Sequence, residues 1–243
     1  MFINCDNLLF YVLLCGICCG PIFTGNSNIL FHITFILVSL TLFIHLINLG
    51  YILGFSSPTI RDLTEILSVM QISSFASMLY VGGTIGSLFI GYIMDRWGRK
   101  QSIIFSAVPA IFGWLLIIWC SLHDTNVIKY VHFLYFSRIL GGISCGMSMA
   151  CTTVYLVEIS PTEWRGTIAS LNQVGITIGI FLSYLIGKYI VYGQSAIIAL
   201  SITVVLFLTG LIIPESPRWL INKDRVTNAK ASLKMLRPKV SFL

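Results

Sequence analysis

The sequence predicts an all-α membrane protein with six transmembrane helices. Of its 243 residues, 56% are hydrophobic and only 10% are charged, whereas a soluble domain carries about 25% charged residues. The mean hydropathy is +0.90, so lipid is the expected solvent, and an ordinary water-soluble enzyme or nucleic-acid-binding protein is excluded. One crossing takes about 20 residues, so twelve crossings would use almost the whole chain, whereas six or seven fit it.

Charged residues mark the ends of the expected spans, because an ion at mid-bilayer costs several kcal/mol. The stretches between them predict helices over residues 32–55, 73–93, 102–121, 130–157, 166–187 and 196–214. A weaker hydrophobic segment over 8–23 is compatible with a short crossing, an interfacial segment or a misassigned translation start. The chain is therefore divided into an N-terminal extension (1–31), a six-helix lobe (32–214) and a basic amphipathic segment (215–243).

The Lys and Arg residues predict the orientation of this multi-pass protein. Eleven of the fifteen lie on one side of the expected helices, three lie on the other, and Arg138 lies within the bilayer. The positive-inside rule makes the side with eleven cytoplasmic, which places the basic loops and the C-terminal tail there. The net charge of +6 therefore reflects topology and attraction to anionic lipid, and no nucleic-acid partner is expected.

Neither a metal site nor a catalytic centre is expected. The seven cysteines lie almost entirely in apolar stretches, and the cluster of Cys15, Cys18 and Cys19 lacks the polar cage that zinc-binding thiolates require. Membrane packing is the favoured role, with lipidation of Cys18 or Cys19 as the alternative. No nucleophile or acid–base pair stands in a plausible setting, so we expect no enzymatic activity and no cofactor.

Three motifs concentrate charge at the cytoplasmic ends of the helices. They are Gly91-x-x-x-Asp95-Arg96-x-Gly98-Arg99-Lys100, Tyr155-x-x-Glu158 with Pro161 and Arg165-Gly166, and Pro214-Glu215-Ser216-Pro217-Arg218. Glu158 and Arg165 can pair with each other or with neighbouring loops, while Glu215 and Arg218 form a further set of opposite charges. One surface pair contributes at most about 1 kcal/mol, but several on one side of a bundle can bias its conformation.

Arg138 is the one basic residue well inside an apolar stretch. Gly142 and Gly146 follow it at i+4 and i+8 and offer a smooth face to a neighbouring helix. An unpaired charge at that depth is costly, so we expect Arg138 to form a salt bridge or hydrogen bonds. Extension of its side chain to the membrane interface is the alternative.

Together these motifs resemble the sugar porter family of the major facilitator superfamily, which includes facilitative glucose transporters and insect trehalose transporters. The resemblance runs from about Gly50 to Pro238 and implies the N-terminal six-helix lobe of that fold, built as a 3+3 inverted repeat. It also implies transport of a hexose or trehalose across the plasma membrane by alternating access. Organic-cation transporters share the Asp95 loop and the Pro-Glu-Ser-Pro-Arg motif, and they are the second candidate among transporter families.

The resemblance also implies roles for individual residues. Gln173 occupies the place of a glutamine that hydrogen-bonds the sugar, and Ile176 and Ile180 follow it at i+3 and i+7, on the same helical face. A cytoplasmic network of charges is implied to hold the outward-facing state through ion pairs. This network comprises Asp95, Arg96, Arg99, Lys100, Glu158, Arg165, Glu215 and Arg218.

The first predicted helix departs from the proton-coupled members of the family. Ile52 stands where these members carry an aspartate, and an isoleucine cannot bind a proton, so facilitated diffusion is expected. Nearby, His45 and Asn48 are interpreted as polar contacts between helices.

The resemblance covers only the first of the two six-helix halves of the superfamily fold. A partial or truncated transporter is therefore the primary interpretation, and a non-transporting sensor or regulatory membrane protein is the competing class. Besides the sugar and the lipid bilayer, a second transporter lobe is an expected partner. It would cover an apolar face that includes Gly175 and Gly179.

Overall fold

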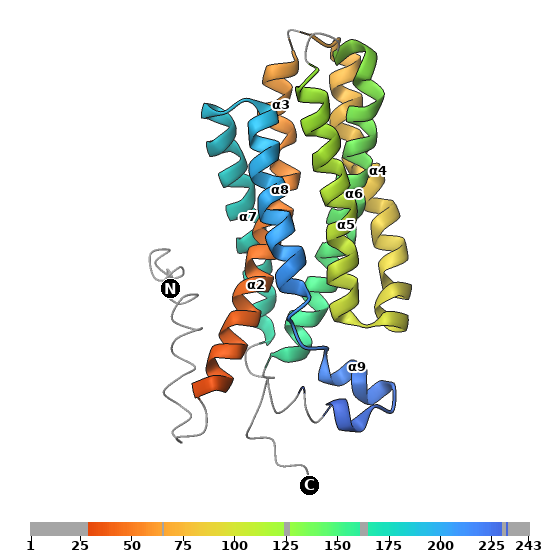
Figure 1. The fold of residues 1–243 in the computed structure, drawn as a ribbon, viewed down its shortest axis with the longest axis vertical. Helices are drawn as coiled ribbons and strands as arrows, with labels where there is room; N and C mark the ends of the chain where they lie inside the picture. The colour runs from red at the N-terminus through yellow and green to blue at the C-terminus, as the bar shows by residue number, and fades with distance from the viewer. Residues whose placement is uncertain (1–28, 65, 124–126, 161–164, 230–231, 233–243) are drawn as a thin grey trace.

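The computed structural model describes residues 29–64, 66–123, 127–160, 165–229 and 232, and over these residues the only regular structure is helical (Figure 1). The helices are α2 (Ile29–Gly54), α3 (Ser56–Leu63), α4 (Val69–Trp97), α5 (Arg99–Ser121), α6 (Val127–Ile159), α7 (Arg165–Tyr189), α8 (Tyr192–Gly210) and α9 (Pro217–Asn222). Six helical stretches, the first of which joins α2 and α3, are long and apolar enough to cross a membrane. The six predicted helices are confirmed, whereas the segment 8–23 lies outside the described residues.

The helix ends differ from the sequence prediction by up to about a turn. The predicted helix 73–93 extends over Val69–Trp97. Ser68 and Gln71 form a capping box that starts the helix earlier. At the other end, Asp95 and Arg96 continue it beyond the apolar stretch. The predicted helix 196–214 is instead shifted and spans Tyr192–Gly210. Its end lies four residues before Pro214, which cannot continue a helix.

Helices α4 and α6 pack backbone against backbone through glycines on both sides. Gly82 and Gly86 of α4 face carbonyl groups of α6, while Gly142 and Gly146 of α6 face carbonyl groups of α4. A Cβ atom at any of these four positions would collide with the opposing backbone. The glycine spacing after Arg138 therefore serves the close helix approach that the sequence predicts.

Helices α2 and α7 form a second pair that also packs through glycines. Gly50 of α2 lies against the backbone of Ile176, and Gly179 of α7 lies against the backbone of Ile47. Each of the two pairs joins the first helix of one three-helix repeat to the second helix of the other, as an inverted repeat requires. The prediction that Gly175 and Gly179 face a missing second lobe is wrong, because Gly175 also packs inside this lobe, against Leu46.

Buried polar side chains connect α2 to the rest of the bundle. The imidazole Nε2 of His45 lies 3.1 Å from the hydroxyl of Ser148 on α6. The Asn48 amide donates a hydrogen bond of 3.3 Å to Thr203 on α8. The interpretation of His45 and Asn48 as interhelical contacts is therefore confirmed.

At one end of the bundle, α9 lies beside the tight turn between α4 and α5 (Figure 1). The short helix α3 lies at the opposite end (Figure 1). The charged motifs of the sequence are thereby gathered at the end that carries α9.

Candidate functional site

A single residue, Gly98, separates α4 from α5. Its φ of +100° lies in the left-handed region, which L-residues with a Cβ rarely adopt. A Cβ atom at Gly98 would also collide with the carboxylate of Glu215. The predicted loop is therefore a one-residue turn, which places Asp95 in the last turn of α4 and Arg99 in the first turn of α5.

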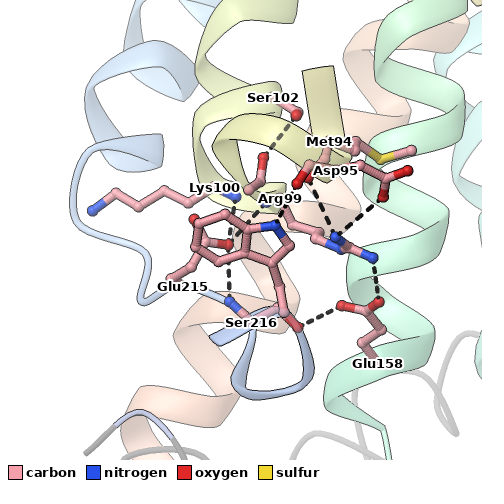
Figure 2. Close-up of polar contacts among 10 residues, drawn as sticks. Met94, Asp95, Arg99, Lys100, Ser102, Glu158, Glu215 and Ser216 are labelled. Atoms are coloured by element: carbon pink, nitrogen blue, oxygen red, sulfur yellow. Dashed lines mark hydrogen bonds and ion pairs between the residues drawn. The ribbon is translucent and has the colours of Figure 1, made fainter. Parts of the chain in front are cut away.

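Glu215 caps the N-terminus of α5 from the segment that follows α8 (Figure 2). Its Oε1 atom accepts hydrogen bonds from the backbone N–H groups of Arg99 at 2.9 Å and Lys100 at 3.0 Å. It also accepts one from the N–H of Ser216 at 3.0 Å. The first N–H groups of a helix lack partners within the helix and carry partial positive charge, so a carboxylate there is stabilised.

Glu215 and Arg218, the further set of opposite charges in the sequence, form no ion pair with each other. Arg218 is exposed and makes no ion pair with any residue that the structure describes. Glu215 instead turns toward α5, because the backbone N–H groups there form a fixed, pre-oriented site for its carboxylate.

Arg99 forms the most enclosed ion pair of this region, with Glu158 of α6 (Figure 2). Arg99 Nη2 lies 2.9 Å from Glu158 Oε1, and the two side chains are 13% and 6% exposed. Glu158 Oε2 also accepts a hydrogen bond from the hydroxyl of Ser216. The sequence prediction that Glu158 pairs with a neighbouring loop is thus confirmed.

The remaining contacts of Arg99 are weaker. Its Nη1 atom donates to the carbonyl of Met94 at 3.3 Å and lies 3.8 Å from the carboxylate of Asp95, whose side chain is 83% exposed. Water screens an exposed charge, so Asp95 contributes little to this arrangement. We refer to Asp95, Arg99, Glu158, Glu215 and Ser216 as the charge cluster.

Further hydrogen bonds attach neighbouring segments to the charge cluster. The indole N–H of Trp219 on α9 donates to the carbonyl of Asp95 at 3.2 Å. The hydroxyl of Tyr155 on α6 donates to the carbonyl of Pro214 at 2.6 Å. Lys100 Nζ donates to the carbonyl of Leu211 at 2.7 Å. As a result, α4, α5, α6, α9 and the chain between α8 and α9 are tied together at one end of the bundle.

Of the other described members of the predicted charge network, Lys100 contacts the charge cluster through its backbone N–H, whereas Arg218 and Arg96 make no ion pair with it. Arg96 is exposed and donates to the hydroxyl of Tyr92, one turn earlier on its own helix, at 2.7 Å. The side chain of Arg165 lies outside the described part of the structure.

Sequence reasoning missed the hydrogen bonds that Ser216 and Trp219 make in this region. Both residues lie in a short segment that reads locally as a turn and a helix start. Their partners, Glu158 and Asp95, are distant in the sequence, so no local spacing could have revealed them. The two prolines at positions 214 and 217, which hold the segment in a non-helical path, were the only available signal.

Arg138 lies fully inside the lobe and is 1% exposed. Its guanidinium carbon is 4.5 Å from the centre of the Phe75 ring and 4.9 Å from that of the Phe55 ring. The expected salt bridge or hydrogen bond is not found among the described residues. Cation–π contacts with two aromatic side chains take its place, because α4 and the junction of α2 with α3 bring rings, not carboxylates, to this depth.

The three residues assigned to substrate differ in their accessibility. Gln173 is exposed, Ile180 is half-buried, and Ile176 is only 5% exposed. Ile176 is part of the buried core, and its backbone lies against Gly50 of α2. The structure therefore leaves Gln173 accessible and encloses Ile176 within the lobe.

Comparison with known proteins agrees with this architecture. The family described as "Sugar (and other) transporter" matches residues 46–241. "Sugar transporter ERD6-like 6" of Arabidopsis thaliana is 37% identical over 194 residues, which cover 79% of this chain and 38% of that protein. "Facilitated trehalose transporter Tret1" of Bombyx mori is 28% identical over 222 residues, which cover 90% of this chain and 42% of that protein. The chain thus spans about two fifths of the length of the curated relatives that it matches.

Among solved structures, the major facilitator superfamily proton:xylose symporter XylE bound to 6-bromo-6-deoxy-D-glucose is similar with a TM-score of 0.75. The sequence identity is 23%, and the match covers 88% of this chain and 50% of XylE. The similarity extends over the six-helix lobe, which corresponds to the N-terminal half of the transporter fold. The lobe therefore has the fold of the N-terminal half of a major facilitator superfamily transporter, and the chain belongs to the sugar transporter family, a family of transporters and not of enzymes.

Proposed function

We propose that this lobe serves facilitative transport of a hexose or trehalose across the plasma membrane by alternating access. Membership of the sugar transporter family supports the substrate class, and the name of the silkworm relative includes both trehalose and facilitated transport. The observation that carries the mechanism is the charge cluster, because it ties four helices together at one end through contacts that a conformational change can break.

The charge cluster is suited to a reversible closure. Its strongest contacts are the Arg99–Glu158 ion pair at 2.9 Å and the capping of α5 by Glu215. Each is polar and lies near the end of the bundle, so water can replace the partners when the end opens. Contacts made in one state and replaced by water in the other set the balance between the two conformations.

Gln173 is the side chain that we propose contacts the sugar. It is exposed on α7, and its side-chain amide makes no hydrogen bond with any described residue. Ser170 and Thr177 lie on the same exposed stripe, but their hydroxyls already donate to carbonyl groups of α7. An unpaired amide facing lipid is costly, so Gln173 is better placed toward a polar cavity, with Ile180 beside it.

The surroundings of Arg138 favour passive transport. Ile52, only 3% exposed, lines the same small cavity as Arg138 and offers no carboxylate to bind and release a proton. We therefore propose a uniporter, in which the sugar gradient alone drives net movement.

We also propose that the charge cluster faces the cytoplasm, as the distribution of Lys and Arg predicts. A cysteine in place of the exposed Arg218 reports this orientation. With Arg218→Cys, a membrane-impermeant maleimide should label intact cells no more than the unsubstituted chain and should label permeabilised cells strongly. Equal additional labelling in both would contradict the orientation.

Sugar exchange in proteoliposomes that contain only this chain tests the proposed activity. Labelled D-glucose or trehalose should enter in a saturable manner, and an inward proton gradient should not accelerate entry. Gln173→Ala should raise the half-saturating sugar concentration about three- to tenfold, the value expected for one lost hydrogen bond. Gln194→Ala, at another exposed glutamine, should leave it unchanged.

Two outcomes would contradict the proposal. Saturable sugar binding without entry would contradict transport by this chain and favour a sensor or regulatory role, or dependence on a second lobe. If neither sugar binds or enters above protein-free vesicles, the proposed substrate class is wrong for this chain, and labelled organic cations become the next substrates to test.

A further inference from the structure

A small internal cavity lies where α2, α5 and α6 meet, with Ile52, Trp114, Ser137 and Arg138 among its lining residues. The rest of the lining is aliphatic or glycine. Its volume is about 10 Å³, close to the roughly 10–15 Å³ that one water-sized occupant needs. A sugar, a phosphate or any other polyatomic ligand of that size is therefore excluded.

Two of the residues that line the cavity, Trp114 and Arg138, carry hydrogen-bond donors that lack acceptors in the described part of the chain. The indole Nε1 of Trp114 and the Nε and Nη2 atoms of Arg138 are buried and have no hydrogen-bond partner among the described residues. The two side chains are 3% and 1% exposed. A buried donor left without an acceptor costs about 1–3 kcal/mol, and more when it is charged. Three such donors at one cavity indicate that an occupant accepts from them.

The aromatic rings around Arg138 do not fulfil this need. Phe55 and Phe75 contact the guanidinium through their faces, and their quadrupoles compensate the positive charge only in part. The N–H bonds of a guanidinium lie in its own plane. A ring face offers no lone pair to accept them, so the Nε and Nη2 groups of Arg138 remain without an acceptor in the part of the chain that the structure describes.

The positive charge of Arg138 is also unbalanced by the described acidic residues. Asp62 pairs with Arg61 and accepts from the N–H of Tyr192, and Asp224 is exposed on the segment after α9. The other described acids, Asp95, Glu158 and Glu215, belong to the charge cluster. A water molecule could accept the hydrogen bonds but would leave the charge uncompensated, which is unfavourable at this depth.

We propose that this cavity binds one small monatomic anion, with chloride as the physiological occupant. The anion accepts hydrogen bonds from Trp114 Nε1 and from the Nε and Nη2 groups of Arg138, and it supplies the charge that no described carboxylate provides. The site lies in the interior of one lobe, and the inference does not depend on which substrate the protein carries.

Equilibrium dialysis of radioactive chloride against the full chain in lipid nanodiscs, in gluconate buffer, tests the site. We expect one saturable chloride ion per chain. Trp114→Phe keeps the ring but removes its N–H, and should weaken chloride binding about tenfold. Trp119→Phe changes a 39% exposed tryptophan outside the cavity lining, on the same helix, and should bind chloride as the unsubstituted chain does.

Ile52→Asp provides a second test that adds a charge instead of removing one. Ile52 lines the cavity, so a carboxylate at this position can balance Arg138 directly and should abolish chloride binding. The midpoint of thermal unfolding should rise when chloride replaces gluconate for the unsubstituted chain, but should not respond to chloride in Ile52→Asp.

Three results would overturn the proposal. The first is the absence of saturable chloride binding together with equal thermal midpoints in chloride and gluconate, which would assign the cavity to water. The second is chloride binding that Trp114→Phe leaves unchanged. The third is chloride binding of full strength in a folded Ile52→Asp chain, which would place the bound ion elsewhere.

Discussion

Replacing Glu215 with glutamine should loosen the junction between α5 and the segment that leads to α9. The substitution preserves the size of the side chain and one carbonyl oxygen, so the hydrogen bonds to Arg99 and Lys100 at 2.9 and 3.0 Å can still form. What is lost is the negative charge that faces the N-terminus of α5. The effect therefore isolates the electrostatic part of the cap.

The size of this weakening follows from the two hydrogen bonds that Glu215 accepts from the first turn of α5. A hydrogen bond to a charged acceptor contributes about 1.5–3 kcal/mol, compared with about 0.5–1.5 kcal/mol for a neutral one. The difference is roughly 1 kcal/mol per bond, and it includes the interaction of the charge with the helix terminus. Glu215→Gln should thus weaken the junction by about 2 kcal/mol, which corresponds to a roughly 30-fold larger opening equilibrium constant.

Hydrogen–deuterium exchange of the first turn of α5 measures this opening directly. The N–H groups of Arg99 and Lys100 point to Glu215, so their exchange reports whether the cap is formed. In lipid nanodiscs, Glu215→Gln should reduce their protection about 30-fold, while amides in the middle of α5 should be unaffected. Asp224→Asn is the matched control, because Asp224 is an exposed acid at φ +56°, a conformation that asparagine tolerates.

The reasoning is refuted if protection of these two amides falls less than threefold in Glu215→Gln. It is equally refuted if Asp224→Asn reduces protection as much, because the effect would then arise from net charge and not from the cap. In a transporting protein, the same substitution should favour the conformation that is open at the end of the bundle that carries α9.

Two further substitutions test the packing and the buried ion pair by thermal unfolding in nanodiscs. Glu158→Gln leaves the enclosed Arg99 without a full counter-charge and should lower the free energy of unfolding by about 3 kcal/mol. The control Arg218→Gln should change the free energy of unfolding by less than about 0.5 kcal/mol. Equal losses in the two variants would contradict the pairing of Arg99 with Glu158. Gly142→Ala places a methyl group on the backbone of α4 and should destabilise by about 1–3 kcal/mol. Gly91→Ala, where nothing lies within 4 Å, should be neutral or stabilising by up to about 1 kcal/mol, so a comparable loss there would exclude helix contact as the cause.

The number and order of the membrane-spanning helices could be read from the sequence because the bilayer imposes a local requirement. Each span needs about 20 apolar residues in a row, and this requirement is met or not met within one segment. The glycines at positions 142 and 146 likewise reported a close helix contact, because only small residues allow backbones to approach in a membrane. What they could not report is the identity of the neighbour, which proved to be α4.

The partners of the charged residues were predictable only in part. The sequence placed Glu215 in a set of opposite charges with Arg218, three residues away, but the carboxylate of Glu215 reaches backbone groups 115 and 116 residues earlier in the chain. A backbone N–H group has no signature in the sequence, since every residue except proline carries one. Accordingly, the residue types of the site were predicted, and the contacts that give Glu215 its role were not.

The sequence by itself determined that this protein is a membrane protein with six spans, that its charges gather at one side, and that it resembles sugar porters. Hydropathy and motif spacing are properties of short segments, so they can be read without a fold. Only the tertiary structure decided that Ile176 is enclosed by α2 and that Arg138 contacts aromatic rings. It also decided that N–H groups of Arg138 and Trp114 lack acceptors among the described residues, and that Ser216 and Trp219 attach the segment of α9 to the bundle. These features depend on which helix faces which, and that arrangement is set by the packing of all six spans together.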